Sequence, residues 1–149
     1  MLKPILGVVL SFVAMMIFFF ALFTALYLAL GAERVFQPGT FKISTLWMVL
    51  ALAGALCVGI LAGYLCFSIS GSSRACQVLA VIVLLLAIVM CLPSISADQT
   101  PRPRAGDMPT MDAMTQGQAP VWMHLLSAVL EGGGVLLGAG MKRNRTRGL

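Results

Sequence analysis

The residue with the clearest chemical potential is a glutamate in the middle of the last apolar segment of the chain. Glu131 is the eleventh of the 21 residues from 121 to 141, a stretch that holds no other acidic residue and no Lys or Arg. Inserting an ionised acid at the centre of a membrane helix costs about 2.5 to 3.5 kcal/mol. A carboxyl group at this depth is therefore a candidate for binding a proton, a cation or a neighbouring helix.

Other polar residues of the segment share a helical face with Glu131. At about 100° per residue, one narrow sector holds the polar residues and two of the glycines, namely His124, Ser127, Glu131, Gly134 and Gly138. Gly134 and Gly138 form a GxxxG pattern, which lets helix backbones approach closely. We interpret this sector as a helix-packing or partner-binding face.

The sequence offers few partners for the carboxyl group of Glu131. No Lys or Arg lies inside any of the apolar segments. Ser127 can hydrogen-bond it locally, and at matching depth in the other segments only the weak S–H of Cys57 can donate. In the isolated chain we therefore expect a mostly protonated Glu131, and an ionised form would need a bound cation, water or a second chain.

A second pattern with chemical potential is a methionine motif between the last two apolar segments. Met108, Met111 and Met114 have MxxMxxM spacing within residues 97–120, which we predict to be a flexible loop because of their proline and glycine content. Thioethers are soft ligands that suit Cu(I), although Met is also a common apolar filler. Cu(I) is the one cofactor that the sequence suggests, since the four cysteines lack a CxxC pair and predict no zinc site.

Signals for catalysis are missing from the chain. It has one His and contains no phosphate-binding loop, no HExxH motif and no nucleophile set beside a base. Because most chemistries need two or more convergent polar groups, we predict that the chain is not an enzyme. The net charge of +5 does not indicate nucleic-acid binding, since the basic residues stand at the ends of apolar segments.

The composition predicts the elements that position these residues. Hydrophobic residues make up 60% of the 149 residues and charged residues 10%, against roughly 25% charged in soluble chains. Three windows of the chain, 4–32, 43–73 and 75–97, hold no charged residue. Each is longer than the roughly 20 residues that a helix needs to cross a bilayer. We predict an all-α integral membrane protein, a single four-helix transmembrane bundle over residues 1–149, with helices at about 6–30, 45–69, 76–95 and 121–141.

The distribution of basic residues predicts an orientation. An even number of spans puts both termini on one side of the membrane. That side holds six Lys and Arg, including those of the basic tail 142–149, and the opposite side holds four. The positive-inside rule therefore places both termini and the tail in the cytoplasm and the loop 97–120 outside it, in a bacterial inner membrane.

The second predicted helix carries a stripe of small residues. Ala51, Ala55, Gly59 and Gly63 recur every four residues, which is typical of a face that packs closely on another helix in lipid. The sequence leaves open whether that other helix belongs to the same chain.

These features lead to three hypotheses for function. The first is a non-catalytic accessory or structural subunit of a larger membrane complex, with lipid, another membrane-protein chain or a second copy as partner. The second is a small oligomeric proton- or cation-linked transporter that uses Glu131. The third is a copper-handling protein that uses the methionine motif.

Overall fold

The computed structural model of the chain describes residues 2–96, 100, 103 and 117–147. Their helices are α1 (Leu2–Leu30), α2 (Ala32–Val35), α3 (Thr45–Ser70), α4 (Ser73–Ser96) and α6 (Val121–Arg147). All but the short α2 are long and apolar enough to cross a membrane. The prediction of an all-helical chain with four such helices is therefore confirmed.

The elements differ from the sequence-based expectation at three points, of which one is that α1 begins at Leu2 instead of near residue 6. The short helix α2 was not predicted, and α6 continues to Arg147 instead of ending near residue 141. The basic residues after 141 are compatible with helix, because cations near a helix C-terminus interact favourably with the helix dipole. The predicted loop 97–120 lies outside the described residues except for 100, 103 and 117–120.

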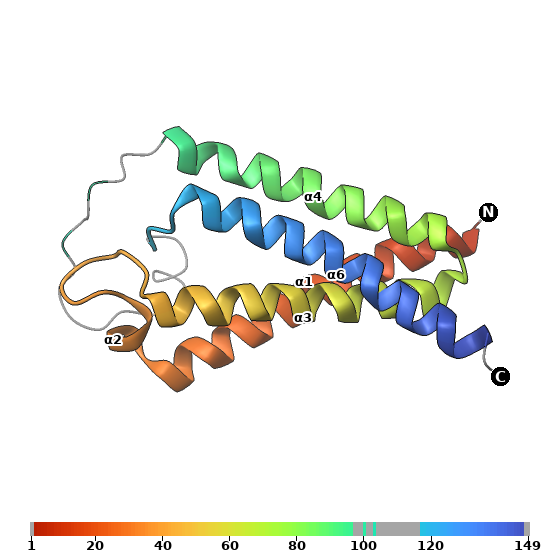
Figure 1. Ribbon diagram of the computed structural model, residues 1–149, viewed down its shortest axis with the longest axis horizontal. Helices are drawn as coiled ribbons and strands as arrows, with labels where there is room; N and C mark the ends of the chain where they lie inside the picture. The colour runs from red at the N-terminus through yellow and green to blue at the C-terminus, as the bar shows by residue number, and fades with distance from the viewer. Residues whose placement is uncertain (1, 97–99, 101–102, 104–116, 148–149) are drawn as a thin grey trace.

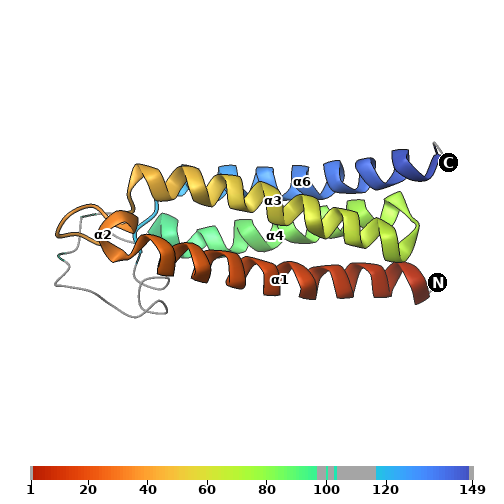
Figure 2. The same cartoon turned by 90° about the horizontal axis from the view of Figure 1, so that it is seen from below.

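The long helices run up and down along a common axis (Figure 1). Both termini lie at one end of the bundle, which we call the terminal end, and the α1–α3 link with α2 lies at the other, which we call the loop end. The same elongated bundle is seen from below in Figure 2. The short connection between Ser70 of α3 and Ser73 of α4 makes these two successive helices antiparallel neighbours.

The helices pack in the spatial order α1, α3, α6, α4. The closest pair is α3 with α6, while α1 packs mainly on α3 and α4 mainly on α6. Helices α1 and α6 make almost no contact with each other. The bundle is therefore held together by its two central helices, and α1 lies apart from α6.

Glycines set the close approach of α3 and α6. A Cβ at Gly59 would meet the carbonyl oxygen of Glu131, and one at Gly134 would lie 2.8 Å from the carbonyl oxygen of Leu56. Since a real Cβ does not fit at such distances, these positions accept glycine alone unless the helices separate. The partner of the small-residue stripe is thus a helix of the same chain.

Two groups of buried side chains close the bundle. The terminal cluster joins all four long helices through residues such as Met15, Val58, Leu79 and Val135. The loop cluster joins α1, α2, the link, α3 and α6, and its buried members are Phe23, Tyr27, Ala32, Val35, Phe36, Ile43, Ala51 and Met123. Space that neither cluster fills remains between them.

The link fixes the loop end of α3. Ser44 is the N-cap of α3: its Oγ accepts a hydrogen bond from the Trp47 backbone N–H at 3.2 Å and donates one to the Arg34 carbonyl at 2.6 Å. Such a cap satisfies one of the free N–H groups at a helix start. The Gln118 N–H donates to the Phe41 carbonyl at 2.9 Å, which ties the chain before α6 to the same link. These hydrogen bonds therefore fix the position of Trp47, at the start of α3, relative to the start of α6.

Candidate functional site

The candidate site is a cavity of about 580 Å³ on the inner side of α1. Its walls come from α1, α2, α3, α4, α6, the link and the residues just before α6, and they include members of both the terminal and the loop cluster. The cavity exists because α1 packs on α3 and leaves α6 almost untouched. Its volume falls within the range of about 300–1,000 Å³ that is usual for small-molecule sites.

Aromatic side chains make up much of the wall. Seven line the cavity, namely Phe12, Phe19, Phe20, Phe23, Tyr27, Phe36 and Trp47. Their positions are fixed by ring contacts: the Phe19 and Phe23 centroids lie 4.4 Å apart, and Phe23 meets Trp47 edge to face at 5.8 Å. The cavity therefore presents ordered aromatic surfaces to its interior.

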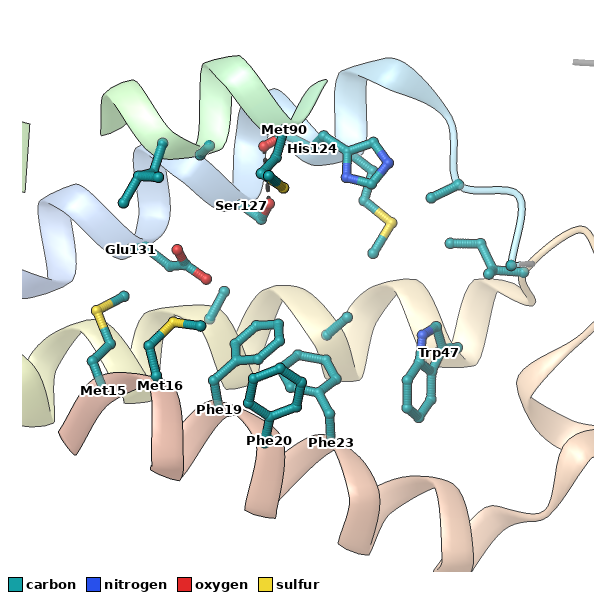
Figure 3. Close-up of a pocket in the computed structure, with 18 of the residues that line it drawn as sticks. Met15, Met16, Phe19, Phe20, Phe23, Trp47, Met90, His124, Ser127 and Glu131 are labelled. Atoms are coloured by element: carbon teal, nitrogen blue, oxygen red, sulfur yellow. Dashed lines mark hydrogen bonds between the residues drawn. The ribbon is translucent and has the colours of Figure 1, made fainter. Parts of the chain in front are cut away.

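The polar side of the cavity belongs to α6. His124, Ser127 and Glu131 follow one another at spacings of three and four residues and all line the cavity, as Figure 3 shows. The Glu131 carboxyl group points away from α6 toward α1, where Met15 and Met16 lie (Figure 3). The wall thus contains a single carboxyl group among mostly apolar side chains.

The carboxyl group has no partner in the described part of the chain. None of these residues forms a hydrogen bond or an ion pair with it. Its surroundings of thioether and aromatic groups cannot stabilise a negative charge as water does. The site is therefore able to take up a proton or a cation.

Neither of the two possible donors named from the sequence hydrogen-bonds the Glu131 carboxyl group. The Ser127 hydroxyl donates to the His124 carbonyl at 2.9 Å instead of to the carboxyl group, because a serine inside a helix can bond the carbonyl of the preceding turn. Cys57 is exposed and is not among the lining residues. The donors that the sequence offered are therefore not used.

The residues of the predicted polar face of α6 lie in two different environments. Gly134 and Gly138 pack on the backbone of α3, where a Cβ at Gly138 would meet the Ile60 carbonyl oxygen. The three polar side chains turn instead toward the cavity. The contact of Gly59 with the backbone of Glu131 holds the carboxyl group at this boundary.

The stripe on α3 divides in the same way. Gly59 and Gly63 contact α6, with Gly63 lying against the Val135 carbonyl oxygen, whereas Ala51 and Ala55 line the cavity. Small side chains at these two positions leave room that larger ones would fill. The glycines of the stripe therefore join α3 to α6, and its alanines form part of the cavity wall.

The residues that sequence reasoning missed are those of α1. Phe12, Phe19, Phe23 and Tyr27 recur at spacings of seven, four and four residues, which places them on one helical face. This periodicity is the signal that could have found them. It is masked by the neighbouring Phe18 and by the uniform hydrophobicity of the segment.

The methionine motif is the predicted metal site of the chain. Met108, Met111 and Met114 lie outside the described residues. Copper binding at this motif stays a prediction. Other methionines, among them Met15 and Met16, line the cavity.

The fold and the cavity define the class of the protein: an all-helical bundle with four helices long and apolar enough to cross a membrane, and a carboxyl group facing an apolar cavity. Comparisons with protein-family models, curated proteins and solved structures found no match.

Proposed function

We propose that this chain is a multi-pass protein of the bacterial inner membrane that binds a small molecule within the bilayer and moves it in exchange for a proton at Glu131. The observation that supports this proposal is the position of Glu131 in a cavity of about 580 Å³ lined with aromatic and thioether groups. Ionisable residues inside membrane segments commonly belong to transport or proton pathways.

The chemistry of exchange follows from the setting of the carboxyl group. When the cavity holds no cation, the neutral acid is the form that apolar surroundings accept. When a cation enters, the carboxylate becomes its counter-charge and the proton is released. The Glu131 carboxyl group thus binds either a proton or a cation. Coupled exchange requires this alternation.

The packing of α1 supports a way of opening the cavity. Helix α1 makes few contacts with α6, whereas α3 and α6 are joined by backbone contact at their glycines. A shift of α1 relative to this pair changes access to the cavity and leaves the close contact intact. Sliding of packed helices is a known route of conformational change in proteins.

The glycines that the accessory-subunit hypothesis proposed as a contact surface for another protein pack within the chain itself. Gly59, Gly63, Gly134 and Gly138 face each other's helices within the chain, so they do not offer a docking face. The outer loop remains for that hypothesis. Native purification tests it, because a constant larger partner that co-purifies would favour a subunit over a transporter.

Transport is tested in proteoliposomes that carry a pH gradient reported by a trapped pH-sensitive dye. Amphiphilic compounds that are cationic, neutral or anionic are added outside, and protein-free liposomes report passive leakage. We expect at least one class to dissipate the gradient faster with the parent protein than without it. We also expect this effect to disappear in Glu131→Gln.

Glu33→Gln is the matched control for this measurement. Glu33 is an exposed acid of α2 that does not line the cavity, so the same carboxyl-to-amide change there should leave the flux unchanged. A parent protein that accelerates no class beyond the protein-free rate would overturn the transport proposal. So would an undiminished flux in Glu131→Gln.

A further inference from the structure

The charges of the cavity point to the chemical class of its occupant. Among the lining residues Glu131 is the one acid, and none is Lys or Arg. The other titratable side chains of the wall are Tyr27 of α1 and His124 of α6, while α3 and α4 contribute none. An anion would meet a carboxyl group and no fixed positive charge, whereas a cation meets a potential counter-charge.

The aromatic wall adds a second argument for a cation. The faces of aromatic rings attract ammonium-type groups, most strongly when water is excluded. Several of the seven lining rings belong to α1, opposite the α6 face that carries Glu131 (Figure 3). A positive centre placed between the two helices thus lies between rings and a carboxylate.

A small metal cation does not suit this wall. Hard cations such as Ca²⁺ and Mg²⁺ need about six oxygen ligands at short distance. The lining side chains provide oxygen only from Glu131, Ser127 and Tyr27, and the Ser127 hydroxyl is engaged with the His124 carbonyl. A large, weakly hydrated cation loses less on leaving water and fills the apolar volume.

The rim of the cavity indicates the route of entry. Four lining residues are also exposed on the outside of the bundle: Met16 and Phe20 of α1 by 42% and 51%, and Leu86 and Met90 of α4 by 41% and 71%. The loop cluster and the terminal cluster close the two ends. The cavity therefore reaches the outer surface between α1 and α4, a surface that faces lipid when the helices cross a membrane.

We propose that the occupant is a lipophilic organic cation, with an ammonium- or phosphonium-type centre and aromatic or alkyl groups, which enters from lipid between α1 and α4 and binds beside Glu131. This inference rests on the proposed function in using the same cavity. It adds the substrate class and the path of entry.

The balance of the binding step is simple. No covalent bond forms; the O–H bond of the neutral Glu131 breaks, its proton passes to water, and the bound cation takes its place as the positive charge. The proton and the cation compete for one carboxylate, so binding strengthens as pH rises. Loss of a proton from His124 acts in the same direction.

The two tryptophans provide a direct readout. The chain has two Trp residues: Trp47 lines the cavity, and Trp122 is 54% exposed and does not line it. In Trp122→Phe the fluorescence therefore reports the cavity alone. The full chain with this change is placed in nanodiscs of zwitterionic lipid, and empty nanodiscs correct for partitioning of the probe.

Two probes of similar size and opposite charge separate charge from hydrophobicity. Tetraphenylphosphonium is expected to change the Trp47 fluorescence saturably, with an affinity higher at mildly alkaline than at mildly acidic pH. Tetraphenylborate is expected to show no saturable change. Glu131→Gln should weaken tetraphenylphosphonium binding at least about tenfold and remove the pH dependence above neutrality, while Glu33→Gln should bind as the parent does.

The outcomes distinguish this inference from the proposed function. Equal binding of the two probes, or undiminished phosphonium binding in a Glu131→Gln protein with an unchanged Trp47 emission spectrum, overturns the substrate class. Transport of a neutral compound in the proteoliposome experiment would then still support the transporter. Phosphonium binding without any Glu131-dependent flux supports the substrate class and contradicts transport.

Discussion

Gly63 of α3 lies against the backbone of Val135 of α6, at a position where a Cβ would overlap the Val135 carbonyl oxygen. Gly138 has the same relation to the Ile60 carbonyl, in the opposite direction across the interface. Two helices that each present glycines to the other's backbone can approach more closely than side chains allow. This contact fixes the central pair of the bundle and, with it, the depth of Glu131.

The first prediction concerns the glycines of α6. Gly138→Ala should destabilise the protein by about 1–3 kcal/mol, because the added Cβ forces the backbones apart. Gly140→Ala is the matched control, since a Cβ at Gly140 meets no atom within 4 Å. It should be neutral or stabilising by up to about 1 kcal/mol through helix propensity. Unfolding in mild detergent by SDS titration measures both, and equal effects would contradict the contact.

The α3–α6 contact also shows what the sequence could and could not predict. The four-residue spacing of small residues on α3 and the GxxxG pattern on α6 each indicate a packing face. Neither pattern identifies the helix on which it packs, because one face of small residues can pack on any other such face. That the two faces meet within one chain depends on the packing of the whole bundle.

The cavity was not predictable for a related reason. A cavity is formed by what the helices fail to fill, and it follows from α1 packing on α3 and leaving α6 almost untouched. The spacing of the polar residues of α6 identified them as one face of the helix. It did not predict that these side chains turn toward the cavity while Gly134 and Gly138 pack on α3. A helical wheel gives directions around one helix and no distances to the others.

The second prediction tests the empty space itself. Ala55 is buried and lines the cavity, whereas Ala53 of the same helix is exposed. Ala55→Leu should raise the free energy of unfolding by about 0.5–2 kcal/mol, as filling of an internal space commonly does. It should also weaken phosphonium binding, because the side chain takes part of the volume.

Ala53→Leu is the control for this substitution. It adds the same groups outside the cavity, so neither stability nor binding should change by more than about 0.5 kcal/mol. Thermal unfolding in detergent and the Trp47 titration measure the two quantities. A destabilised Ala55→Leu protein would mean that the space beside Ala55 is filled.

The third prediction concerns topology. Both termini lie at the terminal end of the bundle (Figure 1), so reporters fused to either one must lie on the same side of a membrane. The bias of Lys and Arg predicts the cytoplasmic side. A green fluorescent protein at the C-terminus should therefore fluoresce in bacterial cells, and an alkaline phosphatase there should be inactive. The reverse pattern would contradict the orientation, and different sides for the two termini would contradict the four-span bundle.

The fourth prediction separates a functional Glu131 from a structural one. A carboxyl group without a partner in an apolar cavity opposes folding, so Glu131→Leu should stabilise the protein, by about 1–3 kcal/mol if the polar group is replaced without strain. A glutamate that joined helices through hydrogen bonds would behave in the opposite way, because its removal would leave a partner unsatisfied. SDS titration of the parent, Glu131→Gln and Glu131→Leu proteins measures the difference. Higher stability together with lost flux is the pattern of a residue kept for activity at the expense of stability, whereas lower stability in both variants would assign Glu131 to the packing of the bundle.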